Sequence, residues 1–373
     1  MQKRLESLDV LRGADLFFLV ALGPIVNAIA RATDIEWIDK SMWIFRHVEW
    51  EGFAPWDIIM PLFMFMAGTT IPFALERYRR NAGKRQAAWR IVRRIALLWI
   101  FGMMCQGNLL ALDPNHLYLY TNTLQAIAVA YGVAAIMYLC TSTRTQIIVA
   151  ATLLAGYWAA MELITIDGFG GGNYTPDANL AEWVDREVLG RWRDHASVEN
   201  GVVVWRKGYH YTWILSSLTF AVTGIAGMLA GKIAKSTMTQ RRKLAWFFGA
   251  GIAMVAVALI WGVWMPIIKI IWTSSMALLA AGISFILLGL SYYFVDYLGY
   301  RKHLTWLKVY GMNSIAAYML TQIINFRGVA NSLFYGLEQY MGDFYSVLMT
   351  VCQVGIIYLI LYVMYRKKIF LKV

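Results

Sequence analysis

The chain has 373 residues, of which 59% are hydrophobic and 15% are charged. A soluble domain carries roughly 45–50% apolar and about 25% charged residues, so this composition excludes an ordinary soluble protein. The formal net charge is +12, and the sequence contains repeated apolar runs. Each run is about 20 residues long, which is the length of an α-helix that crosses a bilayer. We therefore predict an all-α, polytopic integral membrane protein.

About ten membrane-spanning helices are predicted from hydropathy. We expect residues 1–373 to form a single transmembrane domain, with one long outer loop at residues 167–212. The first apolar run contains charged residues and lacks a small-residue cleavage site, so we expect a membrane helix rather than a cleaved signal peptide. In chain order the predicted spans are 14–30, 54–75, 95–112, 118–140, 147–166, 213–231, 244–264, 272–297, 309–325 and 344–365.

The basic residues are divided unevenly between the predicted loops. With the N-terminus in the cytoplasm, the segments on that side contain 23 Lys and Arg, and the opposite loops contain 10. Cytoplasmic loops carry such an excess, so we predict that both termini are cytoplasmic. Attraction to anionic lipid accounts for the positive charge, and we predict no nucleic-acid partner.

Cysteine chemistry and metal binding are not indicated. The three cysteines are odd in number and fall within apolar runs, at Cys105, Cys140 and Cys352. Neither a disulfide framework nor a zinc-binding spacing can be derived from them. We predict no metal.

Charged and polar residues at the start of the first span are candidate ligands. Ionisable groups within a membrane are costly and mark a site by default. Arg12 and Asp15 are three residues apart, on one helical face. Alternatively, they form an intrahelical pair, with Arg12 reaching to the interface. Ser7 and Asp9 have a second interpretation as N-caps of the first helix.

Three further polar residues lie in or beside the later spans. Lys269 is close to an outer helix end, where the alternative is a side chain that reaches to the membrane interface. Asn313 and Ser314 interrupt an apolar run, and their alternative role is an interhelical hydrogen bond.

His47 and Asp57 are the candidate acid–base pair. They are ten residues apart, so helical geometry does not join them, but a turn around Gly52 and Pro55 would bring them together. The carboxylate would then orient the imidazole and stabilise its charged form, as a general base requires. The alternative is that His47 is a surface residue of the loop.

Several motifs, spread from the first residues to the last, resemble one family. The family is the membrane-bound heparan-alpha-glucosaminide N-acetyltransferases and their bacterial relatives, within the wider transmembrane acyltransferases. The motifs occur in the same order as in the family, and are residues 4–13 (RLESLDVLRG), 46–52 (RHVEWEG), 57–68 (DIIMPLFMFMAG), 124–125 (LQ), 269–275 (KIIWTSS), 311–314 (GMNS) and 365–370 (YRKKIF).

The resemblance implies an enzyme of a bacterial inner membrane that takes an acetyl group from cytoplasmic acetyl-CoA and transfers it across the membrane to an amino sugar or glycan. It identifies His47 as the catalytic residue and Asp57 as its partner, with His47 acting either as a base or as the acetyl carrier. The basic segment 77–94 would receive the CoA phosphates. The expected CoA-binding residues are Ser7, Asp9, Arg12, Arg93, Arg94, Lys269, Trp272, Ser275, Asn313 and Ser314.

The sequence departs from the family at several positions of the outer half. An Asn is common in the first helix of the family, but the aligned residue is Gly23, and Asn27 follows one turn later. Two other functions stay open, namely a transporter of glycans or lipid-linked saccharides and an acyltransferase relative without catalytic activity. The sequence also leaves open which acceptor is used, whether nitrogen or oxygen is acetylated, and whether the chain forms a homodimer.

Overall fold

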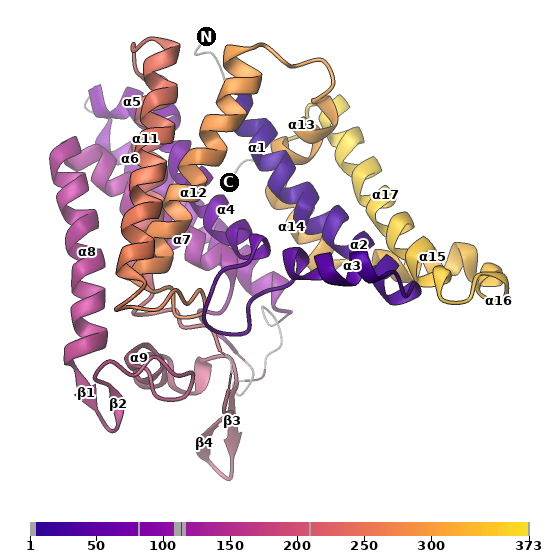
Figure 1. Cartoon of the computed structure of the whole chain (residues 1–373), viewed down its shortest axis with the longest axis horizontal. Coiled ribbons are helices and arrows are strands. Elements are labelled where there is room, and N and C mark those ends of the chain that lie inside the picture. The colour runs from indigo at the N-terminus through magenta and orange to yellow at the C-terminus, as the bar shows by residue number, and fades with distance from the viewer. Residues whose placement is uncertain (1–4, 81–82, 108–112, 114–116, 209, 372–373) are drawn as a thin grey trace. The chain divides into compact units, whose positions relative to one another are not determined.

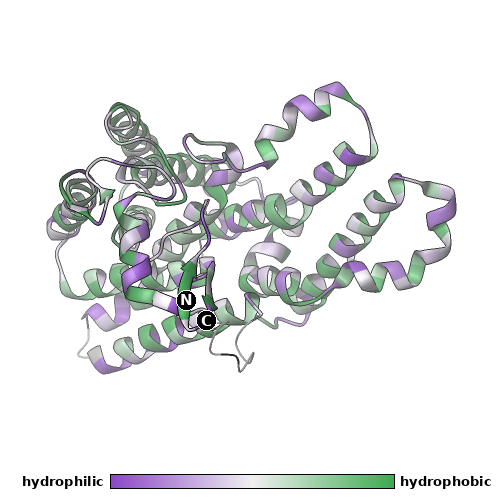
Figure 2. Ribbon diagram, turned by 90° about the horizontal axis from the view of Figure 1, so that it is seen from below, coloured by the Kyte–Doolittle hydropathy of each residue, from purple (hydrophilic) through white to green (hydrophobic). Residues whose placement is uncertain are grey.

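Helices dominate the computed structural model, which describes residues 5–80, 83–107, 113, 117–208 and 210–371 (Figure 1). In this part of the chain, eight helical segments are long and apolar enough to cross a membrane, and hydrophobic residues extend along the long helices in Figure 2. Each coincides with one of the spans expected from hydropathy, which supports an all-α polytopic membrane protein. The eight segments are Glu6–Ala32, Pro55–Arg79, Thr123–Cys140, Thr143–Leu163, Ser217–Lys235, Gln240–Trp261, Ser274–Tyr297 and Phe344–Arg366.

The span predicted at residues 95–112 differs from these eight. It overlaps α6 (Lys84–Cys105), a continuous helix of 22 residues. The last 18 residues of α6 still contain three arginines, so its composition is less apolar than that of the other spans. Residues 108–112 lie outside the described residues.

The span predicted at residues 309–325 is divided between two short helices. They are α13 (Thr305–Met312) and α14 (Ser314–Ile323), and Asn313 between them has φ −125° and ψ 39°. This backbone conformation is not helical. The expected total of about ten crossings therefore stays a prediction.

The described chain forms two compact units. Unit 1 consists of residues 5–47, 54–59 and 290–371. Unit 2 consists of residues 48–53 and 60–289.

Unit 1 is built around a long N-terminal helix and a second helix packed tightly against it. α1 (Glu6–Phe17) continues through a π-helical turn into α2 (Gly23–Ala32). α1 packs so closely against α13 that a Cβ atom on Gly311 would lie 1.9 Å from the carbonyl oxygen of Asp9. The other helices of this unit are α3 (Glu36–Ser41), α15 (Phe326–Phe334), α16 (Glu338–Met341) and α17 (Phe344–Arg366).

Unit 2 contains most of the candidate spans, with α10 (Ser217–Lys235) buried among them. A Cβ atom on Gly227 would lie 1.9 Å from the carbonyl oxygen of Phe65, and one on Gly224 would lie 2.5 Å from that of Ala130. Glycine thus lets backbones approach closely, as is common between membrane helices. The other helices are α4 (Ile59–Thr69), which begins in unit 1, α5 (Ile71–Arg80), α6, α7 (Thr123–Cys140), α8 (Thr143–Leu163), α9 (Leu180–Leu189), α11 (Gln240–Trp261) and α12 (Ser274–Tyr292), which continues into unit 1.

One end of unit 2 gathers basic helix ends. Lys235, at the end of α10, donates a hydrogen bond from Nζ to the carbonyl oxygen of Pro72 in α5 over 2.6 Å. Lys232 donates to Oε1 of Gln146, in the first turns of α8, over 2.5 Å. Nζ of Lys235 also lies 3.7 Å from Oε2 of Glu76, in the second half of α5. These contacts place α5, the end of α10 and the start of α8 together, and we call this region the basic end.

The predicted outer loop, residues 167–212, has a folded structure. It contains α9 and the antiparallel hairpin of β3 (Ala196–Glu199) and β4 (Val202–Trp205). A second hairpin pairs β1 (Thr165–Ile166) with β2 (Phe169–Gly170). These four short strands were not expected from the sequence.

Buried charges hold this outer segment together. The guanidinium of Arg193 bonds to both carboxylate oxygens of Glu182, and both side chains are almost fully buried. Asp185 accepts the backbone N–H groups of Trp213 and Ile214 over 2.8 and 2.9 Å. The carboxylate of Asp185 therefore fixes the chain just before α10 begins.

Candidate active site

His47 and Asp57 form a direct contact within unit 1. Nδ1 of His47 lies 2.6 Å from Oδ1 of Asp57. The His47 side chain is 42% exposed, whereas that of Asp57 is 2% exposed. The approach of these two residues, expected from the turn between them, is therefore present in the structure.

The local sequence fixes the Asp57 carboxylate. Pro55 begins a 3-10 turn over Pro55–Ile58, and its fixed φ suits the first position of a helical turn. The second carboxylate oxygen, Oδ2, accepts the backbone N–H of Ala54 over 2.9 Å. Both oxygens therefore have a defined partner, one in the imidazole and one in the backbone, and the carboxylate is held in one orientation.

The turn between His47 and Asp57 depends on a glycine. Residues 48–53 belong to unit 2, where the N–H of Gly52 donates to the carbonyl oxygen of Ile267 over 2.8 Å. Gly52 has φ +120°, a conformation that other residues rarely adopt. A side chain at this position would therefore strain the turn.

A cluster of aromatic rings lies on one side of the imidazole of His47. Trp56 lies edge-on to it, with ring centroids 6.5 Å apart. Phe18 and Phe45 contact Trp56 in turn, at centroid distances of 5.2 and 6.2 Å. The candidate base thus lies beside an apolar aromatic cluster.

Trp56 was not identified from the sequence, and its position explains the glycine at residue 23. A Cβ atom on Gly23 would lie only 2.2 Å from Cη2 of Trp56. The indole therefore occupies the space that a side chain from this position of the first span would take. Asn27 donates to the carbonyl oxygen of Gly23 over 2.9 Å, within its own helix.

The geometry defines the chemistry open to His47. Because the carboxylate accepts from Nδ1–H, the neutral ring carries its lone pair on Nε2, a tautomer assigned from the hydrogen bond. Nε2 is then the atom that takes a proton or forms a bond to an acyl group. The imidazolium or acyl-imidazolium that results remains next to the negative charge of Asp57.

The first predicted cluster of CoA ligands lies on α1. Nη1 of Arg12 lies 3.8 Å from Oδ1 of Asp9 and donates to the carbonyl oxygen of Gly311 over 3.4 Å. Both side chains are largely buried. Arg12 is thereby directed toward α13, beside the predicted GMNS segment.

Ser7 is also buried in α1. Its carbonyl oxygen accepts from Oγ of Ser291 over 2.7 Å, and its N–H donates to Asp296 over 3.3 Å. α1 begins at Glu6, and no side chain caps it. The interpretation of Ser7 and Asp9 as N-caps is therefore wrong, because both lie inside the helix.

Asn313 and Ser314 lie at the break between α13 and α14. Asn313 is buried, and its side chain holds the C-terminal segment by donating to the carbonyl oxygen of Ile369 and accepting from the N–H of Leu371, over 3.0 and 3.1 Å. Ser314 begins α14. The amide of Asn313 thus joins the GMNS segment to the tail, and a CoA contact stays a prediction.

Arg93 and Arg94 differ in their surroundings, although both lie on α6. The guanidinium of Arg94 stacks on the ring of Tyr131 in α7 at 4.1 Å, and its buried Nε has no hydrogen-bond partner among the described residues. Arg93 is exposed. Only Arg94 therefore faces the helix bundle of unit 2.

The predicted ligands at residues 269–275 pack inside another part of unit 2. Trp272 is fully buried and its indole N–H donates to Thr223, while Oγ of Ser275 donates to the carbonyl oxygen of Pro266. Lys269 is buried as well. These contacts position the segment before α12, and cofactor binding by the three residues stays a prediction.

Two other histidines form a pair in the outer segment. The rings of His195 and His210 are stacked, with centroids 4.0 Å apart and an interplanar angle of 22°. Nε2 of His210 donates to the carbonyl oxygen of Arg206 over 2.8 Å. Burial lowers the pKa of His195, and the nearby His210 and Arg193 lower it further.

Among the residues that the structure describes, no group of three or more His, Cys, Asp and Glu side chains is placed to hold an ion, and the expectation of no metal stays a prediction. His116 lies outside the described residues.

The chain is similar to two curated proteins over almost all of its length, although no family model matches it. It is 23% identical to human heparan-alpha-glucosaminide N-acetyltransferase over 418 residues and 22% identical to the mouse enzyme over 419 residues. Each alignment covers 99% of this chain and 60% of the relative, so the chain spans about three-fifths of the relatives' length. The resemblance seen in the motifs is thus confirmed, and the chain is a distant relative of the heparan-alpha-glucosaminide N-acetyltransferases.

Proposed function

We propose that the chain is a membrane acetyltransferase that uses acetyl-CoA from the cytoplasmic side and acetylates an amino sugar or glycan on the outer side. The contact of 2.6 Å between His47 and Asp57 carries this proposal. The similarity to two N-acetyltransferases over 99% of the chain supports it.

His47 has two ways to perform the transfer. As a base, Nε2 takes the proton from the acceptor nitrogen or hydroxyl oxygen while that acceptor atom attacks the thioester carbonyl. The C–S bond then breaks and CoA leaves as the thiolate. As a carrier, Nε2 itself forms a bond to the thioester carbon, the C–S bond breaks and CoA leaves as the thiolate. The acceptor atom then attacks the acetyl carbon, the bond from this carbon to Nε2 breaks, and the freed Nε2 takes the acceptor's proton. In both, Asp57 holds the ring and stabilises its positive charge.

Acetyl transfer by the purified full-length chain tests the proposal. The protein is incubated with labelled acetyl-CoA and a panel of amino sugars and glycan fragments, and label on the acceptor is counted. We expect transfer to at least one acceptor, and its loss in His47→Ala. Binding of acetyl-CoA without transfer to any acceptor would favour a relative without catalysis, and absence of binding would favour a transporter.

The proposed orientation has its own test. A single cysteine is placed at Ser197, in the outer segment, or at Thr237, between α10 and α11, in a variant without the three native cysteines. A membrane-impermeant maleimide applied to sealed cells should label the first and spare the second. The reverse pattern would invert the topology.

A further inference from the structure

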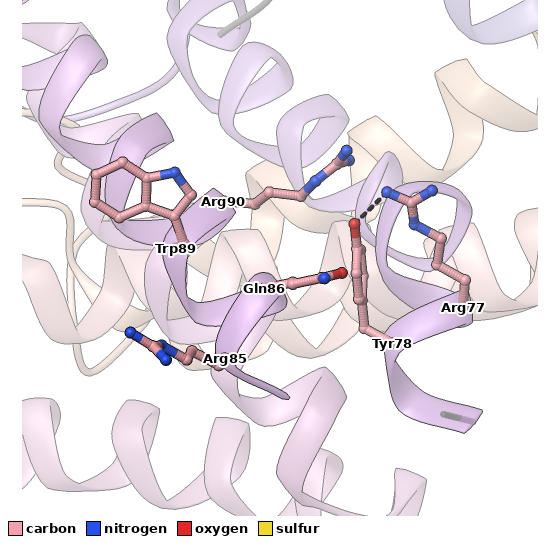
Figure 3. Close-up of a pocket in the computed structure, with 6 residues that line it drawn as sticks. All are labelled: Arg77, Tyr78, Arg85, Gln86, Trp89 and Arg90. Atoms are coloured by element: carbon pink, nitrogen blue, oxygen red, sulfur yellow. Dashed lines mark hydrogen bonds between the residues drawn. The ribbon is translucent and has the colours of Figure 1, made fainter. Parts of the chain in front are cut away.

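Helices α5 and α6 enclose an open hollow of about 410 Å³ at the basic end of unit 2 (Figure 3). Arg77 and Tyr78 come from the last turns of α5, where the candidate span Pro55–Arg79 ends. The other lining residues, Arg85, Gln86, Trp89 and Arg90, come from the first turns of α6. The hollow is therefore located where two helices leave the expected apolar layer.

Two arginines of this hollow, Arg77 and Arg90, contact the buried ring of Tyr78. The guanidinium of Arg77 lies 4.5 Å from the ring centroid of Tyr78 and also donates to its hydroxyl, and that of Arg90 lies 5.4 Å from the same centroid. Arg85 adds a third charge, and none of the six lining residues is acidic. Three guanidinium groups without a carboxylate in the lining favour an anion, and arginine matches phosphate oxygens especially well.

The α6 side of the hollow continues into an exposed apolar face. In Figure 3, Gln86 and Arg90 point toward Tyr78, while Arg85 and Trp89 line the hollow from further round α6. Trp89 is 67% exposed, and exposed Val92, Ala96 and Ile100 follow it at helical spacing. A phosphate in the hollow would therefore lie at the head of an apolar strip.

We propose that this hollow binds the phosphate of an anionic phospholipid, with an acyl chain lying on α6 from Trp89 to Ile100. Basic pockets between membrane helices bind such headgroups, and tryptophan is enriched at the level of the headgroups. A water-soluble phosphate compound, such as the CoA expected at the basic segment 77–94, would make the same contacts to the arginines. It would have no use for the apolar strip, so the strip favours the lipid.

Lipid binding to the full-length protein in an uncharged detergent tests this site. The probe is dioleoylphosphatidylglycerol, compared with dioleoylphosphatidylcholine, which has the same chains and no net charge. We expect saturable binding of the anionic lipid. Arg85→Gln with Arg90→Gln should weaken it about tenfold or more, because two charge-assisted contacts are lost.

A matched variant separates a defined site from general charge attraction. Arg241→Gln with Arg242→Gln removes the same charge from two exposed arginines at the start of α11. This pair should change the affinity by less than about twofold, since it lies outside the hollow. Equal losses in the two double variants would overturn the proposal. Arg85→Gln alone, at an exposed position, provides a smaller loss in case the double variant is unstable.

Soluble competitors identify the source of the phosphate. Glycerol 3-phosphate and CoA are added to the protein loaded with the anionic lipid, and the lipid is expected to remain bound. The proposal of a lipid would be overturned if either compound displaced the lipid and bound more weakly to the Arg85 and Arg90 variant. The hollow would then be the site of a soluble ligand. Trp89→Ala should weaken lipid binding more than Trp246→Ala does, since Trp246 is similarly exposed on α11.

Discussion

The two histidine pairs place imidazoles in opposite electrostatic surroundings. His47 in unit 1 faces the buried carboxylate of Asp57, whereas His195 in the outer segment is stacked on a second imidazole, that of His210. Oδ2 of Asp194 also lies 3.8 Å from Nε2 of His195, but burial, His210 and two arginines together lower the pKa of His195. A carboxylate favours the charged ring, while a neighbouring imidazole and arginines oppose it. The partner of each ring therefore decides which histidine is suited to take up a proton during a reaction.

Hydrogen bonding makes the same distinction. Asp57 accepts from Nδ1 of His47 and also from the backbone of Ala54, so it holds the ring in one tautomer. His210 donates from Nε2 to a backbone carbonyl, and its buried Nδ1 has no partner among the described residues. The stacking of the two outer rings is thus a packing contact.

Replacing His47 should give the largest effect. His47→Ala should lower turnover on the true acceptor by about 10² to 10⁴, the usual contribution of a general base. Acetyl-CoA binding should persist, because the predicted phosphate contacts lie on other residues. Steady-state rates and equilibrium binding of acetyl-CoA test both statements. A variant that retains more than about a tenth of the turnover would remove His47 from catalysis.

Replacing Asp57 should cost less. Asp57→Asn removes the charge that stabilises the imidazolium. Asp57 accepts hydrogen bonds from the imidazole and from the N–H of Ala54, and the amide NH₂ group of asparagine cannot accept one of these two bonds. Loss of one charge-assisted hydrogen bond is worth about 1.5–3 kcal/mol, so turnover should fall roughly ten- to hundredfold. The measurement is the rate at saturating acetyl-CoA. An unchanged rate would mean that the contact only holds the turn.

Arg12 separates donor binding from the chemistry at His47. Arg12→Ala should weaken acetyl-CoA binding about tenfold, because one charge-assisted contact is lost, and should change the rate at saturation much less. Arg366→Ala, at an exposed arginine near the end of α17, is the control. Calorimetric titration measures both variants. Equal affinities would exclude Arg12 as a phosphate ligand.

The outer histidines should matter least for turnover. His210→Gln keeps a side-chain donor that can reach the carbonyl oxygen of Arg206, so the rate should change by less than about threefold. A loss as large as that of His47→Ala would reverse the comparison and make His210 the candidate base. The same assay with acetyl-CoA and the active acceptor measures this variant.

Several of these features could be predicted from the sequence, because they depend on local patterns. Apolar runs identified the eight long helices, and the spacing of His47, Gly52 and Asp57 predicted a turn that joins the pair. Trp56 was missed because its contact with Gly23 joins residues far apart in the chain. No local pattern could indicate that an indole fills the space beside a glycine.

The outer segment also has contacts that the sequence pattern does not reveal, here between residues closer together in the chain. The sequence predicted a loop at residues 167–212, since this stretch lacks a long apolar run. The structure contains α9 and a hairpin held by the buried pair of Arg193 and Glu182. Charged residues are normally a sign of exposure, so their burial as a pair could not be recognised from composition.

The buried carboxylates of this segment predict a small pH effect on stability. Burial raises the pKa of Asp185 to about 7, although Arg193 and the N–H groups of Ile214 and Trp213 lower it, while Glu182 raises it. In the unfolded chain, an aspartate titrates near pH 3.9. The folded protein therefore binds more protons between about pH 4 and 7, and the free energy of unfolding falls as the pH rises through that window.

Asp194 acts in the same direction, since burial raises its pKa to about 6, whereas the lowered pKa of His195 acts in the opposite direction below about pH 6.5. We therefore expect a higher melting temperature at pH 5 than at pH 7.5. The difference should be about 2–4 °C for each kcal/mol by which the free energy of unfolding at pH 5 exceeds that at pH 7.5. Asp185→Asn should flatten this dependence while lowering the melting temperature at every pH, since an amide cannot accept both backbone N–H groups as a carboxylate does. Asp343→Asn, at an exposed position, should keep the wild-type slope. Because the test compares slopes, a general loss of stability does not affect it, and equal slopes in wild type and Asp185→Asn would show that Asp185 is ionised throughout this range.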